Sequence, residues 1–256
     1  MRMRKDLTIA ILGVSGVLTI RSHRCDEARL GYNLRARSPR QLDAIEEDDV
    51  ASSDGNDVAR IYQRLGSGYD RMSTLLDRAA VNRMRTELIA RATGDVLEVA
   101  VGTGANLRHY PAGVRVTGLD FAAKAVTAAT RRARMLSMEF TPVVGDAEHV
   151  PLAEATVDTV VCTLGACTFA RPDVVFDEMR RVLRPGGHVL FLEHVRAANR
   201  AGRAVLRAIK PLTVAALGCH PDRDTVQTLI AAGFTIEVLD RAMGGLFLTV
   251  RATPAG

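Results

Sequence analysis

The stretch DVLEVAVGTGANL, residues 95–107, places a short aliphatic run directly before two glycines. An aliphatic run of this kind is typical of a strand that is buried on both faces of a sheet. Gly102 and Gly104 permit a sharp turn and a close approach of the backbone to a ligand. We therefore expect a buried strand over residues 95–101 whose carboxyl end forms part of a binding site.

The rest of the chain alternates strand-like runs with amphipathic stretches. The further strand-like runs are 114–120, 140–146, 157–164, 187–195, 235–240 and 245–253. The helix-like runs are 58–93 (interrupted by Gly66 and Gly68), 104–109, 122–137, 172–183, 199–216 and 222–232. Because right-handed crossovers place helices on both faces of a sheet, we predict an α/β fold with a doubly wound, mostly parallel sheet of seven strands. The last two runs are close in sequence, which predicts an antiparallel final strand.

The composition divides the chain near residue 57. Residues 1–40 hold nine Lys and Arg but three Asp and Glu, whereas residues 41–60 hold one Arg and seven Asp and Glu. Acidic, Ser- and Gly-containing sequence of this kind is typical of a linker. We expect residues 1–56 to be a basic and apolar head with an acidic linker, poorly ordered, and residues 57–256 to be one folded domain.

The head begins like a signal peptide, with basic residues before an apolar run from Leu7 to Ile20. No small-residue cleavage motif follows, and the run is shorter than the roughly 20 residues that span a bilayer. An interfacial anchor, a degenerate signal and an extension outside the folded domain all stay open. We expect a cytoplasmic protein and leave open a peripheral membrane contact through the head.

Two acidic residues end predicted strands, Asp120 after the second and Asp146 after the third. Asp120 follows the glycines by about 20 residues and can accept hydrogen bonds from both ribose hydroxyls of a nucleoside. Asp146 can accept from an exocyclic amine while the Ala147 N–H donates to a ring nitrogen, which are the contacts that adenine requires. Leu107 stands where a dinucleotide fingerprint has its third glycine, so an NAD-dependent oxidoreductase is the weaker alternative.

These motifs together resemble the class I S-adenosylmethionine-dependent methyltransferases, which have a Rossmann-like fold. The motifs are ExAxGTG (98–104), GLD (118–120), VVGDA (143–147) and LRPGGH (183–188). Within that class the chain is most similar to the ubiquinone/menaquinone C-methyltransferases, phospholipid N-methyltransferase-like proteins and methyltransferase-like thiol S-methyltransferases. The matching segments there are YDRM (69–72), PL (151–152), FLEHV (191–195), GCH (218–220) and RDT (223–225). The resemblance covers roughly residues 57–250.

The resemblance implies transfer of a methyl group from S-adenosylmethionine to a small hydrophobic or amphiphilic acceptor by in-line displacement, with the acceptor atom undetermined. It implies that the N-terminal helices form a lid. The implied cofactor-binding residues are Glu98, Ala100, Gly102, Gly104, Asp120, Phe121, Asp146, Ala147, Leu164 and Tyr69. Ala100 stands where the family usually has glycine.

Cys167, Phe169 and Cys219 are expected to line the acceptor pocket. If the acceptor carries a proton, His194 and then His220 are the candidate general bases, because an imidazole titrates near pH 6.5. A module that binds the cofactor without catalysing transfer is the second alternative.

The four cysteines, Cys25, Cys162, Cys167 and Cys219, show no paired metal-ligand spacing. We therefore expect no metal site and a reducing compartment. The expected partner is a small-molecule acceptor and not nucleic acid, since aromatic residues make up only 4% of the chain.

Residues 199–216 predict an amphipathic helix near the acceptor. Arg200, Arg203, Arg207 and Lys210 recur at near-helical spacing beside Val205, Leu206 and Ile209. Residues three or four apart share a helix face. An acidic or amphiphilic acceptor, an anionic membrane and plain solvent are the three surroundings left open for this basic stripe.

Overall fold

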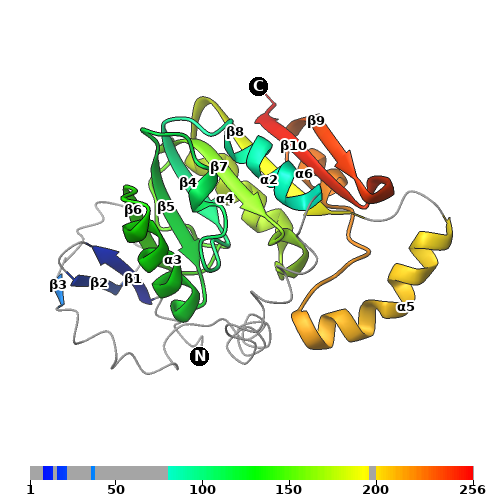
Figure 1. The fold of residues 1–256 in the computed structure, drawn as a ribbon, viewed down its shortest axis with the longest axis horizontal. Coiled ribbons are helices and arrows are strands. Elements are labelled where there is room, and N and C mark those ends of the chain that lie inside the picture. The colour runs from blue at the N-terminus through cyan, green and yellow to red at the C-terminus, as the bar shows by residue number, and fades with distance from the viewer. Residues whose placement is uncertain (1–7, 14–15, 22–35, 38–79, 196–199, 256) are drawn as a thin grey trace, which may run out of the picture.

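The computed structural model describes residues 8–13, 16–21, 36–37, 80–195 and 200–255 (Figure 1). The strands are β1 Thr8–Gly13, β2 Gly16–Arg21, β3 Ala36–Arg37, β4 Asp95–Val99, β5 Arg115–Asp120, β6 Phe140–Val144, β7 Val157–Thr163, β8 Leu183–His194, β9 Phe234–Ala242 and β10 Phe247–Pro254. The helices are α2 Ala80–Ile89, α3 Ala123–Met135, α4 Pro172–Val182, α5 Arg200–Leu217 and α6 Thr225–Ala231, with 3-10 turns η3 Leu107–His109, η4 Ala166–Thr168 and η5 Met243–Gly245.

Seven of the strands form the predicted sheet, in the order β6-β5-β4-β7-β8-β10-β9. Strands β6, β5, β4, β7 and β8 pair in parallel, and β10 pairs antiparallel with both β8 and β9. The register places Val99 opposite both Leu119 of β5 and Cys162 of β7. The predicted fold class, with a reversed final strand, is therefore confirmed.

The sheet also extends beyond β6 by three strands that the sequence did not predict. Strands β1 and β2 form an antiparallel hairpin, β1 pairs antiparallel with β6, and β3 pairs with β2. The apolar run after the basic start thus contributes strands to the sheet. The predicted domain boundary near residue 57 stays a prediction, since residues 38–79 lie outside the described part of the chain.

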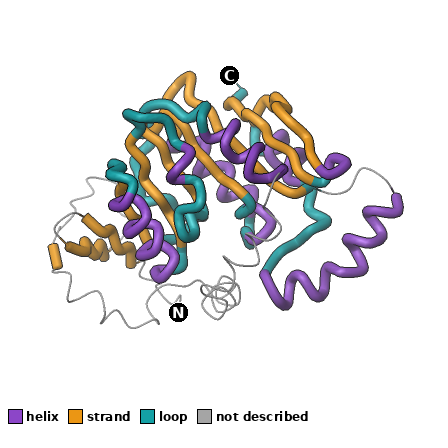
Figure 2. The backbone as a smooth tube through the Cα atoms, in the orientation of Figure 1, coloured by secondary structure: helices purple, strands orange, loops and turns teal. Residues whose placement is uncertain are grey.

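Helices cover both faces of the central sheet (Figure 2). Alternate residues of each central strand belong to two different cores, one on each face. Leu97 and Val99 of β4 belong to the core beneath α4 and α6, whereas Val96 belongs to the core beneath α2 and α3. Phe176 of α4 packs edge-on against Phe191 of β8, with ring centroids 5.7 Å apart. Helices on both faces explain why these strands are aliphatic on both sides.

The predicted helix over 104–109 is wrong. Gly102 and Gly104 adopt left-handed backbone angles, with φ of +53° and +78°, so the chain turns sharply instead of entering a helix. Only the 3-10 turn Leu107–His109 follows. The predicted helices at 122–137, 172–183 and 199–216 are confirmed, and α2 is the described part of the predicted 58–93. The predicted helix at 222–232 begins later, at Thr225, because the Asp224 side chain accepts the Gln227 N–H as the N-cap of α6.

None of the helices within the described residues is long and apolar enough to cross a membrane. Helix α5 is amphipathic as predicted, and it projects to one side of the sheet body in Figure 1. Val205 and Leu212 are 59% and 71% exposed, so the apolar face of α5 is open to solvent among the described residues. Lys210 pairs with Asp222 at 2.9 Å.

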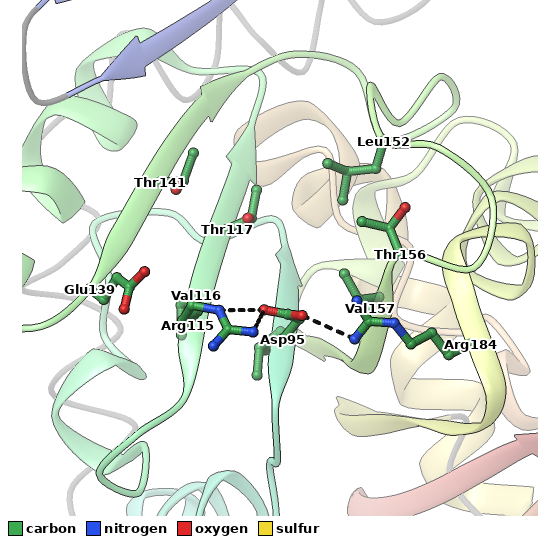
Figure 3. Close-up of a pocket in the computed structure, with 11 residues that line it drawn as sticks. Asp95, Arg115, Val116, Thr117, Glu139, Thr141, Leu152, Thr156, Val157 and Arg184 are labelled. Carbon is green, nitrogen blue, oxygen red and sulfur yellow. Dashed lines mark hydrogen bonds and ion pairs between the residues drawn. The ribbon is translucent and has the colours of Figure 1, made fainter.

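The amino ends of the strands carry a cavity of about 240 Å³ that is bounded by ion pairs (Figure 3). Asp95 lies between Arg115 and Arg184, with nitrogen–oxygen distances of 2.6 and 3.0 Å. Arg184 also pairs with Asp158 at 2.8 Å. Open α/β sheets bind ligands at the opposite edge, the carboxyl ends of the strands, so we assign a structural role to this cluster.

Asp158 joins the amino ends of two strands. It accepts the Asp95 N–H at 2.8 Å, and Gly94, at φ +66°, leaves room for its carboxylate. The hydrogen bond from the Asp95 N–H lowers the pKa of Asp158, and Arg184 adds to this effect while burial opposes it.

We expect Asp158→Asn to lower the free energy of unfolding at pH 7 by about 0.5–1 kcal/mol, because its 38% exposed side chain is partly screened by solvent. A carboxyl with a lowered pKa stabilises the fold above its unfolded pKa of about 3.9, and loses this effect as the pH falls through its folded pKa. The difference between the two proteins should therefore shrink below about pH 4. Urea unfolding at pH 7 and below about pH 4 measures this difference in the free energy of unfolding, with the exposed Asp177→Asn as the matched control. An equal loss of stability at the two pH values contradicts the stabilising role of the Asp158 carboxylate.

Candidate functional site

The carboxyl ends of five parallel strands bring the predicted site residues to one edge of the sheet. From β6 across to β8, the strand ends present Asp146, Asp120, the Gly102 turn, Leu164 and His194. Residues that are far apart in sequence therefore stand in one row. The row leads from the predicted adenine-binding residues to the predicted acceptor side.

Asp120 ends β5 and holds the turn that follows β4. Its Oδ2 accepts the Gly102 N–H at 2.8 Å and its Oδ1 accepts the Ala122 N–H at 2.9 Å. Burial raises the pKa of Asp120, and these backbone hydrogen bonds oppose that shift. Each carboxylate oxygen keeps a second lone pair, so two hydroxyl groups of a ligand can still donate to it.

The Gly102 turn has the shape of a ligand cradle. A Cβ built on Gly102 meets no atom within 4 Å. Gly104, by contrast, is closed, because a Cβ there would lie 2.6 Å from Leu107 Cδ1. We infer that Gly102 faces the ligand, whereas Gly104 is needed for packing.

Glu98 is 2% exposed and anchors a network that the sequence did not predict. Its carboxylate accepts Asn106 Nδ2 and the Tyr110 hydroxyl, each at 2.8 Å. Asn106 is held in turn by Arg85 of α2, at 2.6 Å, and by Thr163 of β7, at 3.0 Å. Burial raises the pKa of Glu98 to about 7, against the lowering effect of its hydrogen bonds. Glu98 thus fixes the turn that carries Gly102 and Gly104.

Two residues other than glycine adopt left-handed backbone angles at the ends of neighbouring strands. Ala100 after β4 has φ +57° and Leu164 after β7 has φ +56°. Such angles cost about 1–3 kcal/mol and cluster at functional sites. Gly165 makes room for Ala100, because a Cβ on Gly165 would lie 2.8 Å from the Ala100 Cβ.

The remaining predicted cofactor residues lie at the β5 and β6 ends of the row. Asp146 and Ala147 are half-buried, and the Asp146 side chain accepts the Glu148 N–H at 2.9 Å. Phe121 directly follows β5 and is half-buried. Tyr69 and the part of the predicted N-terminal lid before residue 80 lie outside the described residues. The described part of those helices, α2, packs on the core through the buried Met84 and Leu88.

The predicted acceptor residues meet beside the ends of β7 and β8. His194 Nε2 lies 3.2 Å from Cys219 Sγ. The Sγ atoms of Cys167 and Cys219 and the His194 imidazole nitrogen all lie within 4.8 Å of one another. Phe169 is half-buried and packs against the core nearby. The sequence spacing gives no sign of this group, because its members come from three separate segments.

Hydrogen bonds tie these segments together. The His220 N–H donates to the Cys167 carbonyl at 3.0 Å. Arg223 Nη1 donates to the carbonyls of Ala166 and Phe169, each at 2.8 Å. The loop after α5 is therefore fixed against the η4 turn.

The charges of this group depend on one another. The hydrogen bond from Cys167 lowers the pKa of the Cys219 thiol, His194 adds to this effect, and burial opposes it. Burial lowers the pKa of His194, but the hydrogen bond with Cys219 and the charge of Glu193 raise it above its usual value. Burial lowers the pKa of His220, as do Arg223 and Lys210. Cys219 and His194 thus influence each other's pKa through their 3.2 Å contact.

Comparison with known proteins identifies the class. The methyltransferase domain family matches residues 97–191. A phosphatidylethanolamine N-methyltransferase from Cereibacter sphaeroides is 31% identical over 201 residues, which are 76% of this chain and 96% of that protein. The chain belongs to the class I S-adenosylmethionine-dependent methyltransferases.

Human thiol S-methyltransferase TMT1B is 44% identical to this methyltransferase over 109 residues, which are 41% of this chain and 45% of TMT1B. The chain spans about half the length of the thiol S-methyltransferases that it matches. Demethylmenaquinone methyltransferases are also similar to it. A crystal structure of an S-adenosylmethionine-dependent methyltransferase from Thermotoga maritima, a possible histamine N-methyltransferase, shares the fold with a TM-score of 0.59 at 19% identity, covering 75% of this chain and 98% of that one.

The geometry fits the cofactor of this class of methyltransferases. Asp120 keeps lone pairs for ribose hydroxyls, the Gly102 turn is open to a ligand, and Asp146 and Ala147 stand at the neighbouring strand end. S-Adenosylmethionine is accordingly the cofactor that the family and the residues both indicate.

We expect Asp120→Ala to weaken binding of S-adenosylhomocysteine to the methyltransferase at least tenfold, since each hydrogen bond to a charged group contributes about 1.5–3 kcal/mol. Asp120→Asn keeps the shape and one acceptor oxygen, so its affinity should fall between the two. Calorimetry measures the affinities and circular dichroism checks the fold. An unchanged affinity in folded Asp120→Ala would sink the ribose assignment.

We expect Gly165→Ala to destabilise the methyltransferase by about 1–3 kcal/mol, because the new Cβ clashes with that of Ala100. The backbone of Gly165, at φ −110° and ψ −31°, accepts alanine without strain. Ala100→Gly removes both the clash and a left-handed alanine, so the double variant should regain most of the lost stability. Urea unfolding of the four proteins gives the coupling energy, and additive effects would refute the contact.

Proposed function

We propose that this chain transfers the methyl group of S-adenosylmethionine to a small apolar or amphiphilic thiol. The main support for this proposal is that Cys167, His194 and Cys219 lie together at the ends of β7 and β8. Strand β7 lies directly beside β4, whose turn forms the methionine end of the predicted cofactor site. An acceptor that enters at β7 and β8 therefore approaches the methyl group from the side of this group.

The chain's own residues bind and orient the cofactor. Asp120 holds the ribose, and Asp146 with Ala147 holds the adenine. The Glu98 network fixes the turn, so the Gly102 backbone presents a rigid surface to the ligand. The cofactor supplies an electrophilic methyl group on a sulfonium. Alignment of two reactants in this way can contribute about 7–11 kcal/mol to catalysis.

A thiol suits the chemistry of the acceptor side. The acceptor sulfur bonds to the methyl carbon as the sulfonium bond to that carbon breaks, giving a thioether and S-adenosylhomocysteine, and the thiol proton passes to solvent. Phe169 supplies apolar surface, while His194 and His220, the predicted candidate bases, lie on the two segments that border the group. The similarity to thiol S-methyltransferase TMT1B supports this choice of acceptor.

A lipid amine is the second candidate acceptor. The phosphatidylethanolamine N-methyltransferase relative is matched over 96% of its length. The exposed apolar residues Val205 and Leu212 of α5, with Arg203 and Arg207 nearby on the same helix, favour an amphiphilic acceptor. This candidate uses the same cofactor site, so the choice of acceptor alone separates the two.

A direct acceptor comparison tests the proposal. The full chain is incubated with S-adenosylmethionine and either an apolar alkyl thiol, phosphatidylethanolamine in micelles or a quinol, and S-adenosylhomocysteine formation is followed by mass spectrometry. We expect kcat/KM for the thiol to exceed that for the other two acceptors at least tenfold, and Asp120→Ala to lower kcat/KM for the cofactor at least tenfold.

Turnover of the lipid amine but not of the thiol contradicts the choice of a thiol acceptor and leaves the methyltransferase assignment intact. Binding of S-adenosylhomocysteine without turnover of any acceptor indicates the non-catalytic alternative. Binding of NAD in preference to S-adenosylhomocysteine overturns the cofactor assignment itself.

A further inference from the structure

Two thiols and one imidazole converge in the half-buried space beside the ends of β7 and β8. Cys167 is buried in the η4 turn, His194 ends β8, and Cys219 lies in the loop after α5. Their three ligand atoms lie within 4.8 Å of one another, and His194 Nε2 is 3.2 Å from Cys219 Sγ. We propose that these three side chains form a site for a zinc ion whose fourth position holds the acceptor thiol.

The donor atoms select the metal. Two sulfurs and one imidazole nitrogen are a soft to borderline set, which favours zinc over magnesium or calcium. Zinc lies about 2.3 Å from sulfur and about 2.0–2.1 Å from nitrogen, so two sulfurs and one nitrogen around one tetrahedral ion are roughly 3.5–3.8 Å apart. The 3.2 Å between His194 Nε2 and Cys219 Sγ and the 4.8 Å limit for the whole group lie on either side of this range.

The backbone already fixes the three segments relative to one another. Glu193 accepts the Ala166 N–H at 2.9 Å and the His194 N–H at 3.0 Å, so one buried carboxylate positions the turn before Cys167 and the end of β8. The His220 N–H donates to the Cys167 carbonyl, and the Thr213 hydroxyl donates to the Cys219 carbonyl. Such surrounding contacts orient metal ligands and raise their affinity.

Charge balance also favours a divalent ion. Before the acceptor binds, two thiolates and one zinc ion carry no net charge, which suits a site with a buried wall. Within the described residues, no further Cys, His, Asp or Glu completes the group. Three protein ligands with one open position are the arrangement of catalytic zinc sites, whereas structural sites have four.

The open position allows the zinc ion to bind the acceptor thiol. This role rests on the proposed function. A thiol that binds zinc there releases its proton to solvent and stays bound as a thiolate, which is the nucleophilic form. The metal would thus position and ionise the acceptor without touching the cofactor. The sequence does not predict this site, because its three ligands are 27 and 25 residues apart and match no short metal-binding motif.

Zinc binding by the full chain tests the proposal. The protein is kept reduced with a phosphine, stripped with a chelator, and titrated with zinc against a chromophoric competitor. We expect one zinc ion per chain, and a cobalt-substituted form with thiolate-to-cobalt charge transfer and intense tetrahedral bands. Cys167→Ser, Cys219→Ser and His194→Gln should each weaken zinc binding at least a hundredfold.

Cys162→Ala is the matched control, because this thiol is 0% exposed within the apolar core and is not part of the group. It should bind zinc as the unaltered chain does. Failure of the unaltered chain to bind zinc, or unchanged binding by all three ligand variants, overturns the site. A Cys167–Cys219 disulfide found in mass spectra of unreduced protein, with no zinc uptake after reduction, would identify a redox pair in its place.

S-Adenosylhomocysteine binding separates this inference from the proposed function. The stripped chain and Cys219→Ser should bind S-adenosylhomocysteine with unchanged affinity, since neither change touches the Asp120 side of the site. Full thiol turnover by the stripped chain would overturn the metal site and leave the methyltransferase assignment intact. Loss of cofactor binding in the unaltered chain would instead overturn the proposed function.

Discussion

The hydrogen bond from the Gly102 N–H to the Asp120 carboxylate joins the ends of two neighbouring strands, and the proposed cofactor site depends on it. It holds the turn after β4 open toward the ligand while Asp120 keeps further lone pairs for the ribose. The parallel sheet makes this possible, because parallel strands present all their carboxyl ends at one edge. Asp146, Asp120, Gly102 and Leu164 thus follow one another in space as the parts of an extended ligand would.

Strain and burial keep this edge rigid. Ala100 and Leu164 hold left-handed angles on adjacent strands, and Glu98 is buried with both oxygens hydrogen-bonded. Each feature costs free energy on its own. The two aliphatic cores on either face of the sheet offset that cost and allow the edge to be shaped for binding. The amino edge, by contrast, is held by ion pairs around Asp95 and Arg184.

Local sequence signals predicted the parts of the fold that local physics determines. Near-continuous Val and Leu runs mark strands buried on both faces, and glycines or acidic residues at their ends mark the site. The 104–109 helix failed because the left-handed Gly102 and Gly104 make turns. The hairpin of β1 and β2 was missed because an apolar run after basic residues also resembles a signal peptide.

Contacts between segments that are distant in the chain could not be predicted from the sequence. Asn106 and Tyr110 hydrogen-bond Glu98, Arg85 hydrogen-bonds Asn106, and none of the three belongs to a spaced motif. Cys167, His194 and Cys219 were each named as acceptor-side residues, but their convergence depends on the pairing of β7 with β8 and on the loop after α5. The spacing of residues along the sequence does not indicate that these side chains come together in space.

A crystal structure of the chain with S-adenosylhomocysteine tests the central claim, that the cofactor lies along the strand ends with its sulfur facing the acceptor group. We expect the adenine beside Ala147, both ribose hydroxyls on Asp120, and the sulfur directed toward Cys167, His194 and Cys219. A ligand whose sulfur points away from these three side chains, or one bound in the amino-edge cavity beside Asp95, would contradict it.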